Sequence, residues 1–299
     1  MEVVIADRRS WQLGVLLILV STAAWSTAGF FTRLIDLDVW TMLAWRGLFG
    51  AAGLFAVIAV TDRGNFWASL RRTGPSDWLF VAISAVGMIF FITSLRHTTV
   101  AHVAIIYATV PLVAAGLGWL VLGERPGRAA MVASMAALIG VAVTVGLGFE
   151  GRLSGDLLAA MMTLAMAAMM VIARRGRGLS VMPAAALSAL VSGLVCWPLG
   201  DPLDVSGHDL LLLACFGLAN SAIGLTLFVY GARLLPPVET ALIGTLETPL
   251  APLWVLIAFG ESPGMSTVAG GLVVFIAVVW YIAVSARAAR RIRQTVMDC

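Results

Sequence analysis

The sequence predicts an all-α integral membrane protein with ten transmembrane helices arranged as two inverted five-helix repeats. The 299 residues are 61% apolar and 12% charged, with a mean hydropathy of +0.99, whereas soluble domains are about 45–50% apolar and about 25% charged. The apolar residues form blocks of about 20, enough to cross a hydrocarbon core about 30 Å thick as a helix. A motif that ends one helix and starts the next occurs twice.

Charged residues, prolines and glycines set the boundaries of the apolar blocks, because each interrupts a helix or an apolar run. The first five helices are expected at about 11–32, 38–61, 75–95, 98–122 and 126–147. The second five are expected at about 154–174, 179–199, 208–234, 236–259 and 263–286. The first block follows Arg8 and Arg9, but it is too long for a signal peptide and nine similar blocks follow it, so we expect it to be retained. The loops are too short to hold a soluble domain.

The distribution of arginine predicts the orientation, since loops rich in positive charge stay in the cytoplasm. All 19 basic residues are Arg. One side of the predicted membrane holds 15 of them: Arg8, Arg9, Arg63, Arg71, Arg72, Arg125, Arg128, Arg174, Arg175, Arg177, Arg233, Arg287, Arg290, Arg291 and Arg293. The other side holds Arg33, Arg96 and Arg152. Both termini are therefore expected in the cytoplasm, which requires an even number of spans.

An internal repeat divides the chain. Pro111-Leu112 is followed by GERPG at 123–127, and Pro249-Leu250 is followed by GESPG at 260–264, a displacement of 137 or 138 residues. A tight helical hairpin by itself favours Gly and Pro, but a shared five-residue frame with an internal Pro-Leu is more than a turn needs. We expect repeats at 1–148 and 149–299, the second with a basic tail. Because five helices is an odd number, the second repeat enters the membrane from the opposite side, as in alternating-access transporters.

These motifs, with Trp25-Ser26 and Arg46, resemble the paired domains of the drug/metabolite transporter superfamily, EamA branch. The resemblance covers nearly the whole chain and implies a transporter of small molecules. In general layout the chain is most similar to YddG-like exporters of aromatic and other amino acids. One departure is that Thr248 separates Glu247 from Pro249, where the family often has Glu directly before Pro. This shifts the carboxylate by about 100° around the helix.

Two ionisable residues fall near mid-depth in predicted spans, where each requires a partner or a wet cavity. Glu247 could face a central cavity and hold a substrate ammonium or a proton, or it could be a buried strut that fixes helix packing. For Arg46 a structural or gating role is favoured, because Asp36 and Asp38 are near enough in sequence to attract its side chain. His102, near the outer end of its helix, is a candidate for a gating or proton-transfer role, or an ordinary interfacial histidine.

Other residues within the spans each have a functional and a structural interpretation. Pro111 and Pro249 each free backbone groups and are candidate helix breaks or hinges, or else passive kinks. Trp25 with Ser26, and Tyr107, lie too deep for the interfacial aromatic belts, so they could line a substrate cavity or pack in the core. Asn220 and Ser221 could contact substrate or form interhelical hydrogen bonds.

The sequence favours a secondary transporter that exports amino acids, aromatic and other neutral, or similar metabolites across a bacterial-type inner membrane by alternating access. Export or import of another metabolite or drug-like compound is the alternative. The chain has no Lys and hence no Gly-x-x-x-x-Gly-Lys loop for ATP. An intramembrane enzyme would need a second deep catalytic group, and a scaffold would need a signalling segment. We expect no cofactor, metal or nucleic acid, and a monomer whose partners are a small-molecule substrate and membrane lipid.

Overall fold

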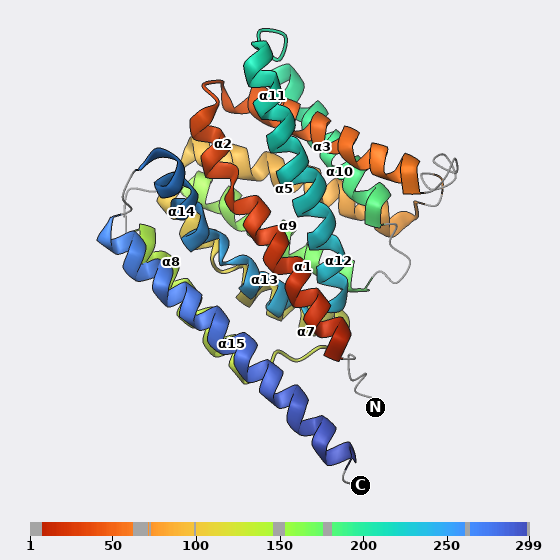
Figure 1. Ribbon diagram of the computed structural model, residues 1–299, viewed down its shortest axis with the longest axis vertical. Coiled ribbons are helices and arrows are strands. Elements are labelled where there is room, and N and C mark those ends of the chain that lie inside the picture. The colour runs from red at the N-terminus through yellow and green to blue at the C-terminus, as the bar shows by residue number, and fades with distance from the viewer. Residues whose placement is uncertain are drawn as a thin grey trace.

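The computed structural model describes residues 8–61, 71, 73–98, 100–145, 153–175, 181–260 and 264–297, and these residues form helices and connecting turns without strands. In Figure 1, α1 begins and α15 ends at the lower end of the molecule, whereas α2 and α11 lie at the upper end. Helix α15 lies along α8 at one edge of the bundle.

The helices of the first half begin with α1 at Arg8. They are α1 (Arg8–Ser26), α2 (Ala28–Leu34), α3 (Val39–Thr61), α5 (Pro75–His97), α6 (Val100–Tyr107), α7 (Val110–Leu122) and α8 (Arg128–Val145). Those of the second half are α9 (Leu153–Arg175), α10 (Val181–Cys196), the 3-10 turn η1 (Trp197–Leu199), α11 (Gly207–Phe216), the π-helix η2 (Gly217–Leu225), α12 (Thr226–Leu234), α13 (Pro237–Gly244), α14 (Glu247–Phe259) and α15 (Met265–Met297).

Each predicted apolar block contains helix, and eight of the helical segments are long and apolar enough to cross a membrane. These are 9–34, 39–60, 103–122, 153–175, 182–199, 207–234, 237–259 and 265–287. Two shorter apolar helices, at 75–91 and 128–144, occupy the third and fifth predicted positions. The chain is therefore an all-helical, multi-pass membrane protein.

The predicted helix ends have local causes. Gly123 and Gly260 end α7 and α14 in the left-handed conformation, with φ of 71° and 68°, which glycine adopts without the steric cost of a Cβ atom. At the start of α5 the Asp77 carboxylate accepts the amide of Gly74 at 2.6 Å. At the start of α3, Asp38 accepts the amides of Trp40 and Thr41 at 2.8 and 3.0 Å.

The fourth and ninth predicted helices are broken near mid-length. Helix α6 ends at Tyr107, four residues before Pro111, and α13 ends at Gly244, five residues before Pro249. A proline ring crowds the carbonyl four residues earlier and donates no N–H, so the helix is interrupted in the preceding turn. The sequence predicted one helix at each place, whereas the structure has two short helices in series. The first predicted helix is also divided, at Thr27, and the eighth contains η2.

The packing pairs corresponding helices of the two halves. Helix α3 packs on α10 and α8 on α15, and α7 of the fourth predicted helix packs on α13 of the ninth. Contacts between non-corresponding helices also match between the halves. Helix α5 packs on α9, and the helices that correspond to them, α12 with η2 and α1, also pack on each other. Exchanging the first half for the second therefore reproduces the packing of α3 on α10, of α8 on α15, and of α5 on α9 with α12 and η2 on α1.

Glycine allows the closest of these approaches. A Cβ atom on Gly47 of α3 would lie 2.7 Å from the Cα of Gly193 in α10. One on Gly140 of α8 would lie 2.8 Å from the carbonyl oxygen of Gly270 in α15. Small residues let helix backbones approach closely in a membrane, where packing stabilises the contact between helices. These two glycine pairs fix the halves against each other.

Candidate functional site

A cavity of about 680 Å³ lies between the two halves, within the roughly 300–1,000 Å³ range of small-molecule pockets. We call it the central cavity. Its polar lining residues are Arg46, Ser84, Ser188, Ser192, Asn220, Ser221, Thr245, Glu247 and Thr248. Its aromatic and methionine lining residues are Trp25, Met88, Phe91, Tyr107, Met162, Met166 and Met169. Such a mixed lining suits a ligand that has both an apolar body and polar groups.

Five of the six residues predicted to contact substrate line this cavity: Trp25, Tyr107, Asn220, Ser221 and Glu247. Ser26 does not line it. Its hydroxyl donates to the carbonyl of Ala23 at 2.7 Å and accepts the indole N–H of Trp254 at 2.8 Å. Ser26 is 1% exposed, so it joins α1 to α14. Ser26 does not share the cavity-facing direction of Trp25, because neighbouring residues on a helix point about 100° apart.

Trp25 and Asn220 bind each other across α1 and η2. The indole N–H of Trp25 donates to the backbone carbonyl of Asn220 at 2.9 Å, and the Asn220 amide donates to the carbonyls of Trp25 and Ala24 at 3.3 and 3.4 Å. Trp25 fits into a slot at Gly224, where a Cβ atom would lie 2.5 Å from its indole nitrogen. Both residues therefore line the cavity and also form interhelical hydrogen bonds.

The π-helical turn η2 supplies backbone acceptors to α1. Besides the Asn220 carbonyl, the Gly224 carbonyl accepts the Ser21 hydroxyl at 2.7 Å. A π-helical segment interrupts the regular i to i−4 pattern and is often found at functional sites. It also brings Asn220 and Ser221, which are 7% and 9% exposed, to the cavity wall. Sequence reasoning found these residues but not the backbone distortion that presents them.

Arg46 is a cation in the cavity wall. Its Nη1 approaches the side-chain oxygen of Asn220 at 3.4 Å, its Nη2 lies 4.0 Å from the sulfur of Met88, and its Cζ lies 5.4 Å from the ring centre of Phe216. Its Nε is buried without an acceptor. Among the described residues no carboxylate lies within 4.0 Å of the guanidinium.

The expectation that Asp36 and Asp38 attract Arg46 is wrong. Asp38 instead caps the start of α3 by accepting backbone amides, and the Arg46 side chain contacts η2 and lines the cavity. The physical reason is that the capping amides lie within three residues of Asp38 along the chain, so they hold its carboxylate at the helix start.

Glu247 is the first residue of α14, immediately after the break that follows α13. It is the one acidic residue that lines the central cavity within the described part of the chain. A helix N-terminus carries a partial positive charge that favours a carboxylate there. Thr248 lines the cavity next to it. The insertion of Thr248 therefore does not turn Glu247 away from the cavity.

The two prolines place cavity residues rather than line the cavity. Tyr107, at the end of α6, and Thr245, at the break before α14, both line it. Pro111 is buried in α7, and Pro249 packs against Gly271 of α15, where a Cβ atom would lie 3.1 Å away. The side chain of His102 lies outside the described residues.

Beyond the cavity, toward the start of α1, the helices are tightly packed. A space of only about 20 Å³ remains there, and Tyr107 and Glu247 border it together with Ile18, Thr22, Val110, Met170, Phe228 and Thr240. This is room for about one water molecule. The central cavity therefore does not continue in this direction.

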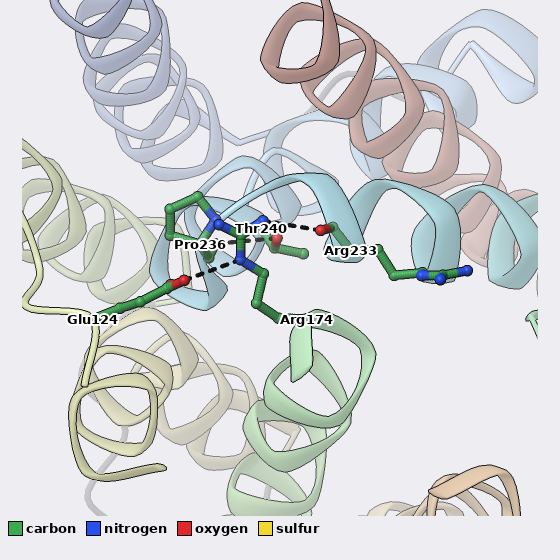
Figure 2. Close-up of polar contacts among 5 residues, drawn as sticks. All are labelled: Glu124, Arg174, Arg233, Pro236 and Thr240. Atoms are coloured by element: carbon green, nitrogen blue, oxygen red, sulfur yellow. Dashed lines mark hydrogen bonds and ion pairs between the residues drawn. The ribbon is translucent and has the colours of Figure 1, made fainter. Parts of the chain in front are cut away.

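Polar side chains join four helices beyond this packed layer, at a place we call the closed end, formed by Trp11, Glu124, Arg174, Arg233 and Glu239. Figure 2 shows the Arg174 guanidinium between the carboxylate of Glu124 and the backbone carbonyl of Arg233, with distances of 3.2 and 2.9 Å. The Trp11 indole donates to Glu239 at 2.9 Å. The two bonds of Arg174 tie α9 to α12 and to the turn after α7, and the bond of Trp11 ties α1 to α13.

Comparison with protein-family models identifies the family to which the sequence belongs. The model of the EamA-like transporter family matches residues 12–146 and again 153–283. The chain belongs to this family. The resemblance noted from the Pro-Leu and Gly-Glu motifs is thereby confirmed, and the EamA-like chain is a member of the drug/metabolite transporter superfamily.

As an EamA-like transporter, the chain is a membrane transporter of small molecules, and the family points to transport rather than catalysis. A crystal structure of a protein superposes on it with a TM-score of 0.77 and 18% identity, over 93% of this chain and 99% of that one. At this identity the likeness shows the fold alone. No curated protein matches the chain.

Two features of this site in the EamA-like chain have no signal in the sequence. The hydroxyls of Ser84 and Ser188 hydrogen-bond each other across α5 and α10 at the cavity wall, and single serines in apolar helices gave no signal for the pairing. The sequence indicates only a loop charge for Arg174, although its partner Glu124 lies within the repeated motif. Only the fold brings these two residues together, because 50 residues separate them.

Proposed function

We propose that the chain is a secondary transporter that exports amino acids, aromatic and other neutral, or similar small metabolites across the inner membrane by alternating access. The observation that carries this proposal is a cavity between the two halves that contains one cation, one acid and several aromatic side chains. Import, or transport of another metabolite or drug-like compound, is the alternative. It would be favoured if the cavity bound uncharged compounds as well as amino acids.

The cavity suits an amino acid chemically. Trp25, Phe91 and Tyr107 offer aromatic surface for an apolar or aromatic side chain, and the methionines of α9 can adapt to different shapes. Glu247 can hold a substrate ammonium or a transported proton, since an acid inside a membrane protein requires a charged or hydrogen-bonding partner. Its position in the wall favours these roles over that of a purely structural strut.

The arrangement of the halves supports alternating access. We propose that 1–148 and 149–299 are two inverted repeats of five spans each, with the helices at 75–91 and 128–144 as the third and fifth. The matched contacts between the halves are those expected of two copies related by a twofold axis in the membrane plane. The breaks near Pro111 and Pro249 then act as hinges, because the helix ladder is already interrupted there.

The orientation follows from the arginine distribution. We propose that the closed end faces the cytoplasm with both termini, and that the cavity in this conformation faces the opposite side. A cysteine introduced for Leu203, which is 90% exposed, should then react with an impermeant reagent added to intact cells. A cysteine for Arg175 should react only after lysis. The reverse labelling pattern would overturn the orientation.

Flux through the purified protein tests the function. Proteoliposomes should accumulate labelled phenylalanine, tryptophan or leucine faster than empty liposomes, and a pH gradient should change the rate if protons are coupled. A wide panel that also includes other metabolites and drug-like compounds separates the main proposal from its alternative. Flux equal to that of empty liposomes for the whole panel would contradict transport.

A further inference from the structure

Arg46 lacks the partners that a buried guanidinium needs. The group has five N–H donors, but the structure gives it one long contact to a neutral amide oxygen, one to a sulfur and an aromatic ring. Its Nε–H has no acceptor. Removing a charge from water without a counter-ion is costly, so a cation left in this state at a cavity wall favours an anion from the cavity.

The backbone fixes Arg46 at this place. A Cβ atom on Gly217 of η2 would lie 2.6 Å from the Arg46 carbonyl oxygen and 3.0 Å from the Gly50 nitrogen. The close approach of α3 and η2 leaves the Arg46 side chain beside the cavity, eight residues into α3. The backbone that carries Arg46 is therefore held in place by the packing of α3 on η2, as the support of a binding group should be.

Asn220 orients the guanidinium. Its amide nitrogen donates to two carbonyls at the end of α1, which leaves its side-chain oxygen directed at Arg46. An amide oxygen positions the cation but does not neutralise it. The remaining N–H groups of a guanidinium match the two oxygens of a carboxylate in a bidentate arrangement.

We propose that Arg46, positioned by Asn220, is the binding site for the carboxylate of the transported substrate. This inference rests on the proposed function and narrows it to substrates that carry a carboxylate, which excludes simple amines and uncharged compounds. A zwitterionic amino acid would then be held between Arg46 and Glu247, which line the same cavity. Asn220 acts through Arg46 as a positioning residue.

Three ligands of similar size test the contributions of the substrate carboxylate and ammonium separately. Phenylalanine carries both groups, phenylpropionate lacks the ammonium, and phenylethylamine lacks the carboxylate. The purified protein should bind phenylalanine most tightly and phenylpropionate measurably. Phenylethylamine should bind at least about tenfold more weakly than phenylalanine, as expected for the loss of a charged hydrogen-bonded pair. Thermal-shift titration or competition binding measures this order, since a ligand of the folded state raises its apparent stability.

Variants test whether Arg46 causes the order. In Arg46→Gln the preference of phenylalanine over phenylethylamine should disappear, whereas Arg46→Lys, which keeps the charge, should retain part of it. Arg287→Gln, which removes an exposed arginine at the end of the last span, is the matched control and should leave the order unchanged. A purely structural role for Arg46 would weaken all ligands equally and leave their ratios as they are.

The outcomes are distinguishable from those of the flux assay. Equal binding of phenylethylamine and phenylalanine to the unmodified protein would overturn the inference, even if Arg46→Gln failed to fold and even if transport were observed. A preference that survives in Arg46→Gln would also overturn it. If phenylalanine and phenylpropionate bind through Arg46 but no flux is measured, the carboxylate site stands and the transport proposal fails.

Discussion

The charged side chains of the closed end and those of the central cavity differ in the partners that they contact. At the closed end, Arg174 meets both a carboxylate and a carbonyl, and Glu239 accepts an indole N–H. In the cavity, Arg46 meets neutral groups and Glu247 stands alone among acids in the described wall. The hydrogen bonds and the ion pair at the closed end hold helices together, whereas Arg46 and Glu247 in the cavity wall are available to a ligand.

The difference also concerns what must change during transport. Under the alternating access proposed above, the closed end would have to separate when the cavity opens toward it, so its bonds would have to be weak enough to break. A partly exposed ion pair meets this requirement, because water can replace its contacts at little cost. The glycine contacts of α3 with α10 and of α8 with α15 instead lie where corresponding helices pack, and there close contact can persist.

Removing the cavity's acid should have the largest effect. Glu247→Gln keeps the size of the side chain and loses its charge, so kcat/KM for phenylalanine transport should fall about ten- to a hundredfold. Binding of phenylpropionate, which has no ammonium, should change little. Thr248→Ser, beside it in the same wall, is the control. An equal loss for both ligands would show that Glu247 has a structural role.

Adding a methyl group at a glycine where two helices cross should have the second-largest effect, and this effect should be on stability. A methyl group at Gly47 would meet the α10 backbone at 2.7 Å, whereas one at Gly116 has no neighbour within 4 Å. Gly47→Ala should therefore lower the free energy of unfolding by about 1–3 kcal/mol, and Gly116→Ala should not lower it. Thermal unfolding in detergent compares the two. Equal midpoints would mean that the α3–α10 contact is not as close as described.

Breaking the closed end should have the smallest effect. The Glu124 and Arg174 side chains are 36% and 24% exposed, so their pairing contributes only about 0.5–1 kcal/mol. In a protein without its native cysteines, Thr240→Cys, buried in the unmodified chain, should react a few-fold faster when Glu124→Gln is added.

The second partner refines that measurement. Arg174→Gln should increase the rate more than Glu124→Gln, because it also removes the bond to the Arg233 carbonyl. The double variant should add little to Arg174→Gln, as expected when two residues act through one contact. If the rate increase in the double variant equalled the product of the increases in the two single variants, the two side chains would not act as a pair.

Much of the fold could be predicted because its signals are local. The apolar length of each block, the Gly that ends α7 and α14 and the Pro in the turn that follows each of them depend on residues close in sequence. The repeated frame around Glu124 revealed the two halves for the same reason. The breaks near Pro111 and Pro249 were foreseen as freed backbone groups, but η2 was not, since a π-helical turn over 217–225 has no sequence pattern of its own here.

The candidate site was predictable only in part. Trp25, Tyr107, Asn220, Ser221 and Glu247 were selected as polar or aromatic residues deep in apolar helices, and all five line the cavity. Ser26 met the same criterion but packs on Trp254. Depth can be read along a helix, whereas the direction of a side chain depends on which neighbour each face meets.

The amino-acid sequence by itself determined that this chain is a helical membrane protein made of two similar halves, because the length and composition of apolar blocks are fixed by the thickness of the lipid. The tertiary structure alone decided that Arg46 faces the cavity with no acidic partner among the residues described, and that Arg174 meets Glu124. Those outcomes depend on how helices cross, and the crossings are set by glycine contacts between residues more than a hundred positions apart, such as Gly47 and Gly193.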